Sequence, residues 1–181
     1  MEVRRIVTGH DEQGRAVFVD VGEPGRTVTF EALPGVVFHE FWSTDDVPSV
    51  PHAGGDPVPA MGSFVPGPGG SRVRFVRMPA DRELEERGED VALARASEEY
   101  ARKVPGLAET MEEDDPGMHA TDTIDYGIVL SGRTILELDE GATEELGPGD
   151  VVIQTGTRHA WRNPFDEPCW MAFVMIGATR A

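Results

Sequence analysis

The sequence predicts a mostly β fold, and three observations carry that prediction. Glycine and proline are frequent, with 21 and 14 residues among 181, and a turn-rich chain with short apolar runs favours β architecture. In the second half, strand-like runs recur about every 8–12 residues with turn signals between them, which is typical of a sandwich or barrel. The best helix candidate is a single run, Ala92–Lys103, rich in Ala, Leu, Arg and Glu.

The first third of the chain is predicted to form short strands. Arg4–Thr8 and Ala16–Val21 flank a turn-like cluster and predict a hairpin. Thr27–Glu31 and Val36–Trp42 are further candidates, and Ser71–Met78 alternates apolar and charged residues. A loop rich in proline and glycine runs from residue 43 to residue 70. A loop of this length is either mobile or functional, for example a lid or a dimer arm.

The second half is more regular. Turn signals such as Ser131-Gly132 and Gly147-Pro148-Gly149 separate its apolar runs. Each run has the length of a single strand. The predicted strands are Ile124–Leu130, Thr134–Leu138, Val151–Gln154, Ala160–Asn163 and Pro168–Ile176.

Composition excludes several classes of partner. The formal net charge is −17, and a field of that sign repels nucleic acid and anionic membrane surfaces. No apolar run is long enough for a membrane helix, and the N-terminus is not a signal peptide. The single cysteine, Cys169, lies in an apolar run and is expected to be a buried, inert thiol. We therefore expect a cytoplasmic protein of one globular domain.

Three residues of the second half could share one metal ion. His119, Asp125 and His159 offer two imidazole nitrogens and a carboxylate, a donor set that suits divalent Fe, Mn, Zn or Ni. Two histidines and one carboxylate with open positions form the facial triad of non-haem iron sites. Spacing alone leaves a second interpretation open, in which the two histidines are simply buried and hydrogen-bonded.

The residues around this triad resemble the two sequence motifs of the cupin superfamily. In the first motif, G(X)5HXH(X)3,4E(X)6G, His119 takes the place of the first histidine and Thr121 that of the second. Asp125 stands at the glutamate, and Gly132 closes the motif after six residues.

The second cupin motif, G(X)5PXG(X)2H(X)3N, is matched from Gly149 to Asn163. Gly156, His159 and Asn163 fall in place, while the spacing before the turn is one residue short. Gln154 replaces the proline.

The resemblance covers residues 117–176. Over these residues the chain is similar to a small, single-domain bacterial cupin of the conserved-barrel type. It implies a double-stranded β-helix (jelly-roll) barrel whose core is residues 117–181. Residues 1–116 would form a strand-rich extension, with the loop and a short helical insert, packed on that barrel. It also implies a homodimer, because small cupins commonly pair through strand exchange.

The resemblance further implies a site. A typical cupin metal site has three histidines and a glutamate, whereas here Thr121 replaces one histidine and the shorter Asp125 replaces the glutamate. Three ligands, His119, Asp125 and His159, with an open position would suit a catalytic divalent metal. We therefore expect a metal-dependent enzyme that acts on a small organic molecule, polyketide-like or carboxylated, by lyase, isomerase or dioxygenase chemistry. The alternative is a metal-free, non-catalytic binding protein, either a sensor or a carrier.

Other residues are expected to complete this site. Trp161 lies two residues after His159, so both side chains point to one face of a strand. Together with Met171, Phe173 and Thr121 it would line an apolar substrate pocket. Two further residues, Asp122 and Asn163, are expected to hydrogen-bond the histidine ligands without touching the metal, and Asp122 could instead be a metal ligand itself. No residue is assigned a catalytic role beyond holding the metal.

Overall fold

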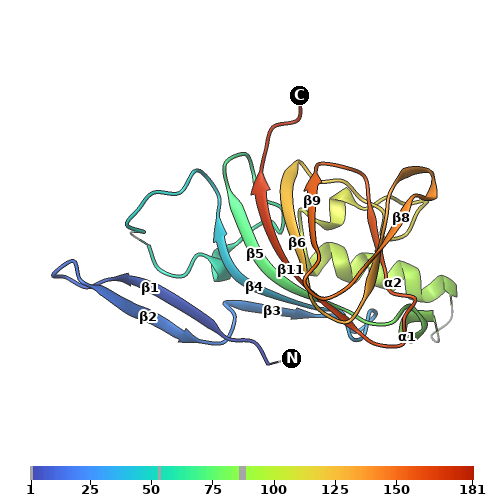
Figure 1. Cartoon of the computed structure of the whole chain (residues 1–181), viewed down its shortest axis with the longest axis horizontal. Helices are drawn as coiled ribbons and strands as arrows, with labels where there is room; N and C mark the ends of the chain where they lie inside the picture. Colours follow the sequence, from blue (N-terminus) through green and yellow to red (C-terminus); the bar gives the residue numbers. More distant parts are fainter. Residues whose placement is uncertain (1, 53, 86–88) are drawn as a thin grey trace.

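The computed structural model describes residues 2–52, 54–85 and 89–181, with side chains except at 84, 85 and 89–93. Strands dominate it (Figure 1). The strands are β1 (Arg5–His10), β2 (Ala16–Gly22), β3 (Arg26–Thr29), β4 (Val37–Thr44), β5 (Ser71–Met78), β6 (Thr123–Ser131), β7 (Thr134–Glu137), β8 (Thr143–Leu146), β9 (Val151–Thr155), β10 (Ala160–Arg162) and β11 (Cys169–Gly177). The α-helices are α1 (Asp81–Glu85) and α2 (Glu89–Lys103), and short 3-10 turns occupy Val58–Ala60, Ala108–Thr110 and Asp139–Gly141. The prediction of a mostly β chain with a helical insert is confirmed.

Two sheets form the body of the molecule. The larger sheet has the strand order β3-β4-β5-β11-β6-β9, and the smaller has the order β10-β7-β8. All their pairings are antiparallel, and β11 pairs with β5 along residues 169–176. The larger sheet therefore combines β3, β4 and β5 from the first 116 residues with strands of the second half. The N-terminal strands extend the same wall that carries the cupin motifs.

The apolar core has two parts. One lies between the two sheets and contains Val129, Leu136, Leu146 and Met171, all buried. The other lies where α2 and the segment after it cover the β3–β5 end of the larger sheet, and Tyr100 there stacks on Phe30 at 5.4 Å. The carboxylate of Glu99 accepts the backbone N–H groups of residues 31 and 32 at 3.0 and 2.8 Å, which fixes α2 to the sheet.

Several elements differ from the sequence-based expectation. The helix begins at Glu89, three residues earlier than predicted, and the additional helix α1 precedes it. Strand β8, Thr143–Leu146, was not predicted because three of its four residues are exposed and polar and show no alternation. The hairpin, by contrast, lies where it was predicted, and β1 pairs with β2. None of the helices that the structure describes is long and apolar enough to cross a membrane.

Candidate metal-binding histidine pair

His119 and His159 lie side by side although 39 residues separate them in the chain. Each backbone N–H donates to the carbonyl oxygen of the other at 2.9 Å, and this pairing forms an isolated antiparallel bridge. The two imidazole rings have centroids 4.2 Å apart. The fold therefore brings the side chains of these two residues together.

An arginine next to His159 ties the two histidine-bearing segments together. The guanidinium of Arg158 donates to the carboxylates of Glu112 at 2.7 Å, Asp115 at 3.0 Å and Asp139 at 3.0 Å. Glu112 and Asp115 precede His119 in the chain. Charge-assisted hydrogen bonds are stronger than neutral ones. The ion pairs of Arg158 therefore help to fix the distance between the backbones of the two histidine-bearing segments.

Both rings present the same nitrogen to the protein backbone. Nδ1 of His119 is 3.0 Å from the carbonyl oxygen of Gly117, and Nδ1 of His159 is 2.9 Å from that of Thr157. A carbonyl oxygen only accepts, so each Nδ1 carries the proton and each neutral ring has its lone pair on Nε2. Neither Nε2 atom has a hydrogen-bond partner in the described part of the chain. This arrangement is typical of metal-binding histidines.

Burial keeps both rings neutral. His159 is 3% exposed. Loss of solvation lowers its pKa to about 4, and the neighbouring His119 acts in the same direction. Loss of solvation also lowers the pKa of His119, against smaller opposing effects of the Gly117 carbonyl and Glu112. At neutral pH both imidazoles are therefore unprotonated at Nε2, as a metal ligand must be.

In the metal-free protein, His159→Gln is expected to make the free energy of unfolding less sensitive to acid. A histidine whose pKa falls from 6.5 to about 4 on folding contributes stability above pH 6.5 and loses it as the pH drops towards 4. Between pH 7.5 and pH 5 the wild type should lose about 2 kcal/mol more than the variant. Urea denaturation at the two pH values measures this difference, and equal losses in both proteins would contradict the assigned burial of a neutral ring.

Asp125 is buried but is not placed with the two histidines. It is 5% exposed, and its Oδ1 has no hydrogen-bond partner among the residues that the structure describes. Loss of solvation raises its pKa, against the opposing effects of the Thr123 hydroxyl, Arg74 and the Thr121 hydroxyl. Among the described residues, no group of three or more His, Cys, Asp and Glu side chains lies close enough to hold a metal ion. The structure thus brings together two of the three predicted ligands.

Further polar side chains in the barrel interior were not predicted. Gln154 lies directly opposite Asp125 in the β6–β9 ladder, and neither Oε1 nor Nε2 of its buried amide has a hydrogen-bond partner in the described ranges of the chain. Glu40 and Arg74 are paired across β4 and β5, with Oε1 and Nε 3.0 Å apart and side chains 0% and 3% exposed. One indication that Arg74 is buried is visible in the sequence. In the alternating strand Ser71–Met78, Arg74 shares a face with the apolar Val76.

The predicted apolar wall is present beside His159. The rings of His159 and Trp161 have centroids 6.0 Å apart, and those of Trp161 and Phe173 are 5.7 Å apart. Met171 is completely buried in the core with which Trp161 and Phe173 pack. Thr121 is buried, and its hydroxyl hydrogen-bonds that of Thr123 at 2.7 Å.

The two residues expected to orient the metal ligands have other partners. The carboxylate of Asp122 is exposed and accepts from the Arg180 guanidinium at 2.6 Å. The amide of Asn163 donates to the carbonyl oxygens of Met78 and Glu167 at 3.3 and 2.9 Å, which fixes a loop. Backbone carbonyls orient the histidine rings instead. Each Nδ1 atom is within hydrogen-bonding distance of the carbonyl oxygen two residues earlier in the chain.

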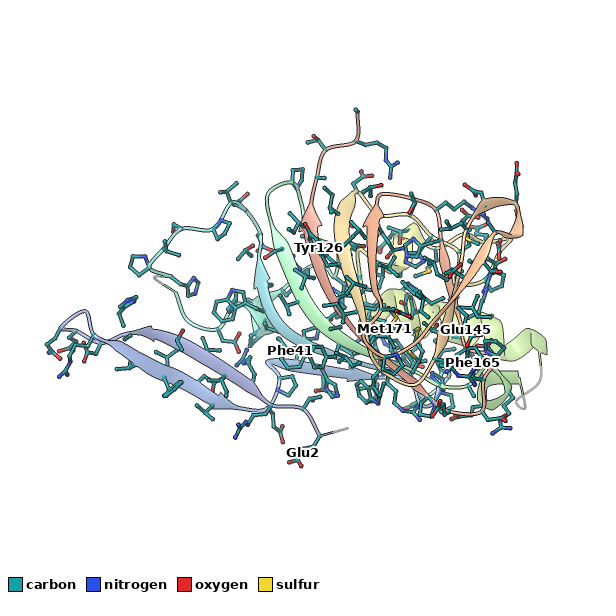
Figure 2. All side chains as sticks on the ribbon, viewed as in Figure 1. Glu2, Phe41, Tyr126, Glu145, Phe165 and Met171 are labelled. Atoms are coloured by element: carbon teal, nitrogen blue, oxygen red, sulfur yellow. The ribbon has the colours of Figure 1, made fainter. Side chains whose placement is uncertain are left out.

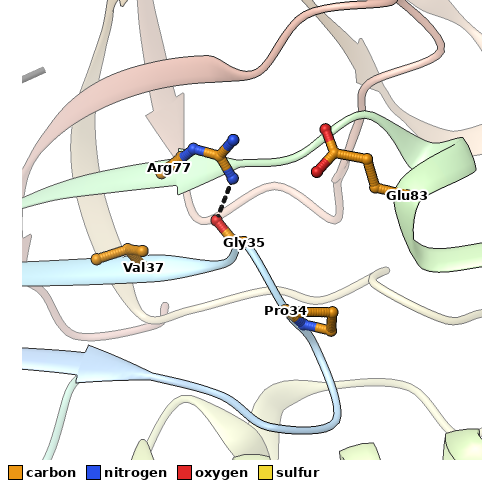
Figure 3. Close-up of a pocket in the computed structure, with 5 residues that line it drawn as sticks. All are labelled: Pro34, Gly35, Val37, Arg77 and Glu83. Carbon is orange, nitrogen blue, oxygen red and sulfur yellow. Dashed lines mark hydrogen bonds between the residues drawn. The ribbon is translucent and has the colours of Figure 1, made fainter.

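Two open pockets formed by described residues lie away from the two histidine rings. One, of about 390 Å³, is lined by Pro34, Gly35, Val37, Arg77 and Glu83, and Arg77 donates to the Gly35 carbonyl across it (Figure 3). The other, of about 810 Å³, has Ala120, Asp122 and Arg180 in its wall. It borders the segment that carries His119 and Thr121, whereas the first lies at the β4–β5 end.

The residues fit a divalent metal in their chemistry and in part of their geometry. Two neutral imidazoles with unpartnered Nε2 atoms are suitable donors for Fe, Mn, Zn or Ni. The unpartnered Oδ1 of Asp125 is a buried oxygen donor on the same motif. The two histidines therefore have the chemistry of metal ligands, while the described residues contain no group of three or more candidate donors close enough to hold an ion.

Comparison with known proteins gives the family. Residues 108–176 match the Cupin_2 family, described as a cupin domain. The chain is 31% identical to Phomopsin biosynthesis cluster protein C′ of Diaporthe leptostromiformis, over 96% of this chain and 78% of that protein. The chain belongs to the cupin superfamily, and its antiparallel sheets are those of a cupin β-barrel.

Two further similarities describe its relatives. The chain is 26% identical to the cupin-domain-containing oxidoreductase fogC of Aspergillus ruber (strain CBS 135680), over 96% of this chain and 72% of that protein. A Cupin 2 conserved barrel domain protein from Salinispora arenicola CNS-205 is 19% identical, with a TM-score of 0.40 over 81% of this chain and 80% of that one. The sequence relatives named here are fungal, so they give no support to the expectation of a specifically bacterial cupin.

Proposed function

We propose that this chain is a metal-dependent cupin enzyme that oxidises a small organic molecule, with His119 and His159 as metal ligands. The observation that carries the proposal is the pair of adjacent, neutral rings, 4.2 Å apart, whose Nδ1 atoms are both engaged by backbone carbonyls. A pair of rings that only filled the core would have no need for two uncommitted Nε2 atoms. Here both are left available for a metal.

The names of the relatives support an enzyme in general and redox chemistry in particular. The first relative belongs to a biosynthesis cluster, and the second is named an oxidoreductase. Among the reaction types that the residues left open, an oxidation using dioxygen therefore has more support than a lyase or isomerase reaction. A bound divalent metal would supply Lewis acidity and, if it is iron, redox activity towards dioxygen.

Other residues of the chain would then bind the substrate. Trp161 and Phe173 stand beside His159 and would hold an apolar part of the substrate. Asp125 and Gln154 offer buried polar atoms without partners, which would accept or donate hydrogen bonds to substrate oxygens. Asp125 would become a third metal ligand only if metal binding moved it towards the two histidines, because the described residues do not place it with them.

A turnover experiment tests this proposal. Protein stripped of metal is reloaded singly with Fe(II), Mn(II), Zn(II) or Ni(II) and incubated with a panel of small aldehydes, ketones and carboxylic acids, under air and under nitrogen. Mass spectrometry should detect an oxidised product with a redox-active metal under air only, and none with His159→Gln. Products formed equally by wild type and His159→Gln would contradict the proposal. Turnover that persists under nitrogen would replace oxidation with lyase or isomerase chemistry.

A second candidate function, a metal-free binding protein, is favoured by one specific observation. Thr121 occupies the place of the second cupin histidine, and its hydroxyl is already bonded to Thr123. A sensor or carrier needs the barrel interior but not the metal. It would bind panel molecules, detected by a shift in the melting temperature, without turning over any of them with any metal.

A further inference from the structure

Four buried side chains of the larger sheet carry polar atoms that have no hydrogen-bond partner in the described part of the chain. These atoms are both carboxyl oxygens of Glu40, Nε of Arg74, Oδ1 of Asp125, and Oε1 and Nε2 of Gln154. Each of the four residues is 5% exposed or less. We call them the interior polar set. Arg74 and Glu40 attract each other at 3.0 Å, but this contact lacks the angles of a hydrogen bond. A buried polar atom without a partner costs stability, so each one needs an explanation.

The strand register places the first half of the interior polar set inside the barrel. Met171 of β11 lies in the core between the two sheets, where Figure 2 labels it. Side chains alternate along a strand, so Phe173 faces the same interior. Directly paired residues of antiparallel strands also share a side. Phe173 pairs with Arg74 of β5, and Arg74 pairs with Glu40 of β4. Glu40 and Arg74 therefore face the barrel interior.

The second half of the set stands on the other side of β11. Met175, which also faces the interior, pairs with Asp125 of β6. Asp125 in turn pairs with Gln154 of β9. Neighbouring strands lie about 4.8 Å apart, so β5 and β6, which flank β11, are about 10 Å apart. One small molecule can therefore contact both halves of the set.

An apolar surface lies between the two halves. A Cβ atom added to Gly127 of β6 would lie 3.2 Å from the Phe173 ring and 3.4 Å from the Met171 side chain, so these two side chains extend over the glycine. Phe173 also packs edge to face with Trp161. A ligand that reaches both halves of the set would rest on this aromatic surface.

The unpartnered atoms need hydrogen-bond donors more than acceptors. Four of the six only accept, namely the two oxygens of Glu40, Oδ1 of Asp125 and Oε1 of Gln154. The other two, Nε of Arg74 and Nε2 of Gln154, donate. A hydroxyl group both donates and accepts, whereas a carboxylate only accepts. Hydroxyl groups therefore complement the set, and a carboxylate leaves most of its acceptors unpartnered.

An open pocket adjoins this part of the barrel. Arg72 pairs with Met175 on the inward side of β5, and its Nε donates to the Ser63 carbonyl at 3.0 Å. Ser63 also lies in the wall of the pocket of about 810 Å³, together with Ala120 and Asp122. The pocket therefore lies next to the end of the barrel interior that holds the second half of the set.

We propose that the interior polar set binds the polar groups of the substrate and selects an uncharged molecule with an apolar body and at least two hydroxyl groups. The hydroxyl groups supply the donors that the set lacks, and the apolar body packs on Phe173 and Trp161. Carboxylated molecules are selected against, because they add acceptors beside two carboxyl groups. The inference rests on the function proposed above and deepens it, since it names the class of substrate for the same barrel.

Isothermal titration calorimetry of the full chain, as purified and after treatment with chelator, tests this selection. The three probes share one benzene ring and differ only in its two para substituents. Benzenedimethanol has two hydroxyl groups, its bis(methyl ether) keeps the oxygens but has no donor, and terephthalate has two carboxylates. The diol should bind with a dissociation constant at least about tenfold lower than either other probe. Binding needs no turnover, so a failure to oxidise any substrate with any metal would contradict the proposed function alone.

Two variants and a matched control connect the selection to the interior polar set. Gln154→Met and Glu40→Leu/Arg74→Met each replace unpartnered polar atoms with apolar ones. Each should raise the dissociation constant of the diol at least about tenfold, while the ligand-free protein keeps or gains stability against urea. Thr134→Val is the control, because Thr134 is just as buried but its hydroxyl donates to the Arg162 carbonyl at 3.0 Å. This variant should lose stability and keep the diol affinity of the wild type.

Several results would overturn the proposal. Absence of diol binding to the wild type is the first. Terephthalate binding as tightly as the diol would indicate an anion site, and equal affinities of the diol and its bis(methyl ether) would mean that donors are not selected. Unchanged diol affinity in either variant would make the set a purely structural feature. A loss of stability in Gln154→Met as large as that in Thr134→Val would mean that the amide already has a partner.

Discussion

Replacing Arg74 with methionine is expected to lower the free energy of unfolding by about 3–5 kcal/mol. The Glu40 side chain is completely buried, and the Arg74 guanidinium is its charge partner, with Nε and Oε1 3.0 Å apart. Burial already raises the pKa of Glu40, and Arg74 is the largest influence that opposes this rise. Without Arg74 the carboxyl group must either stay charged in the interior or take up a proton, and both outcomes cost stability. Urea denaturation at neutral pH measures the change.

The double variant Glu40→Leu/Arg74→Met is the control for this prediction. Replacing both members of a buried ion pair by apolar residues removes the uncompensated charge as well as the attraction. The double variant should therefore be more stable than Arg74→Met alone. A loss below about 1 kcal/mol in Arg74→Met, or a double variant less stable than the single one, would contradict this account of the pair.

His159→Ala is expected to weaken metal binding by more than about 100-fold, because loss of a ligand should cost more than loss of a group that only orients one. His119→Ala should behave in the same way, since the two Nε2 atoms play equivalent roles. Competition with a chelator of known affinity measures the metal dissociation constant of each protein. Circular dichroism checks that each variant keeps its fold.

Variants of two aspartates extend this prediction about metal affinity. Asp125→Ala reports whether the buried carboxylate is a third ligand: a loss as large as that of His159→Ala assigns it to the metal, and a smaller loss assigns it to the substrate. Asp122→Asn is the matched control, because its carboxylate is exposed and paired with Arg180. It should leave the affinity unchanged. Equal affinities in wild type, His119→Ala and His159→Ala would contradict the proposed site.

The strands could be predicted from the sequence wherever side chains alternate between core and solvent. Ser71–Met78 and the hairpin are examples, because turn residues bound them and their pattern has a period of two. Strand β8 could not be found in this way, since Thr143, Glu144 and Glu145 are all exposed and only Leu146 reaches the core. Its position depends on pairing with β7, a long-range property that its own residues do not encode.

The candidate site was predictable in part for a similar reason. The motif spacing identified His119 and His159, and the two-residue offset placed Trp161 beside His159. The groups that orient the rings are backbone carbonyls of Gly117 and Thr157, and a carbonyl has no signature in the side-chain sequence. Asp122 was therefore assigned a role that the backbone performs. Glu40 escaped notice because a lone charge in an apolar run is normally solvated.

Elemental analysis of wild type and His159→Ala, both purified without chelator, tests the central claim of a metal held by the histidine pair most directly. We expect about one divalent ion per chain in the wild type and almost none in the variant. Near-zero metal in both proteins, or equal metal in both, would contradict the claim and leave the chain as a metal-free binding protein.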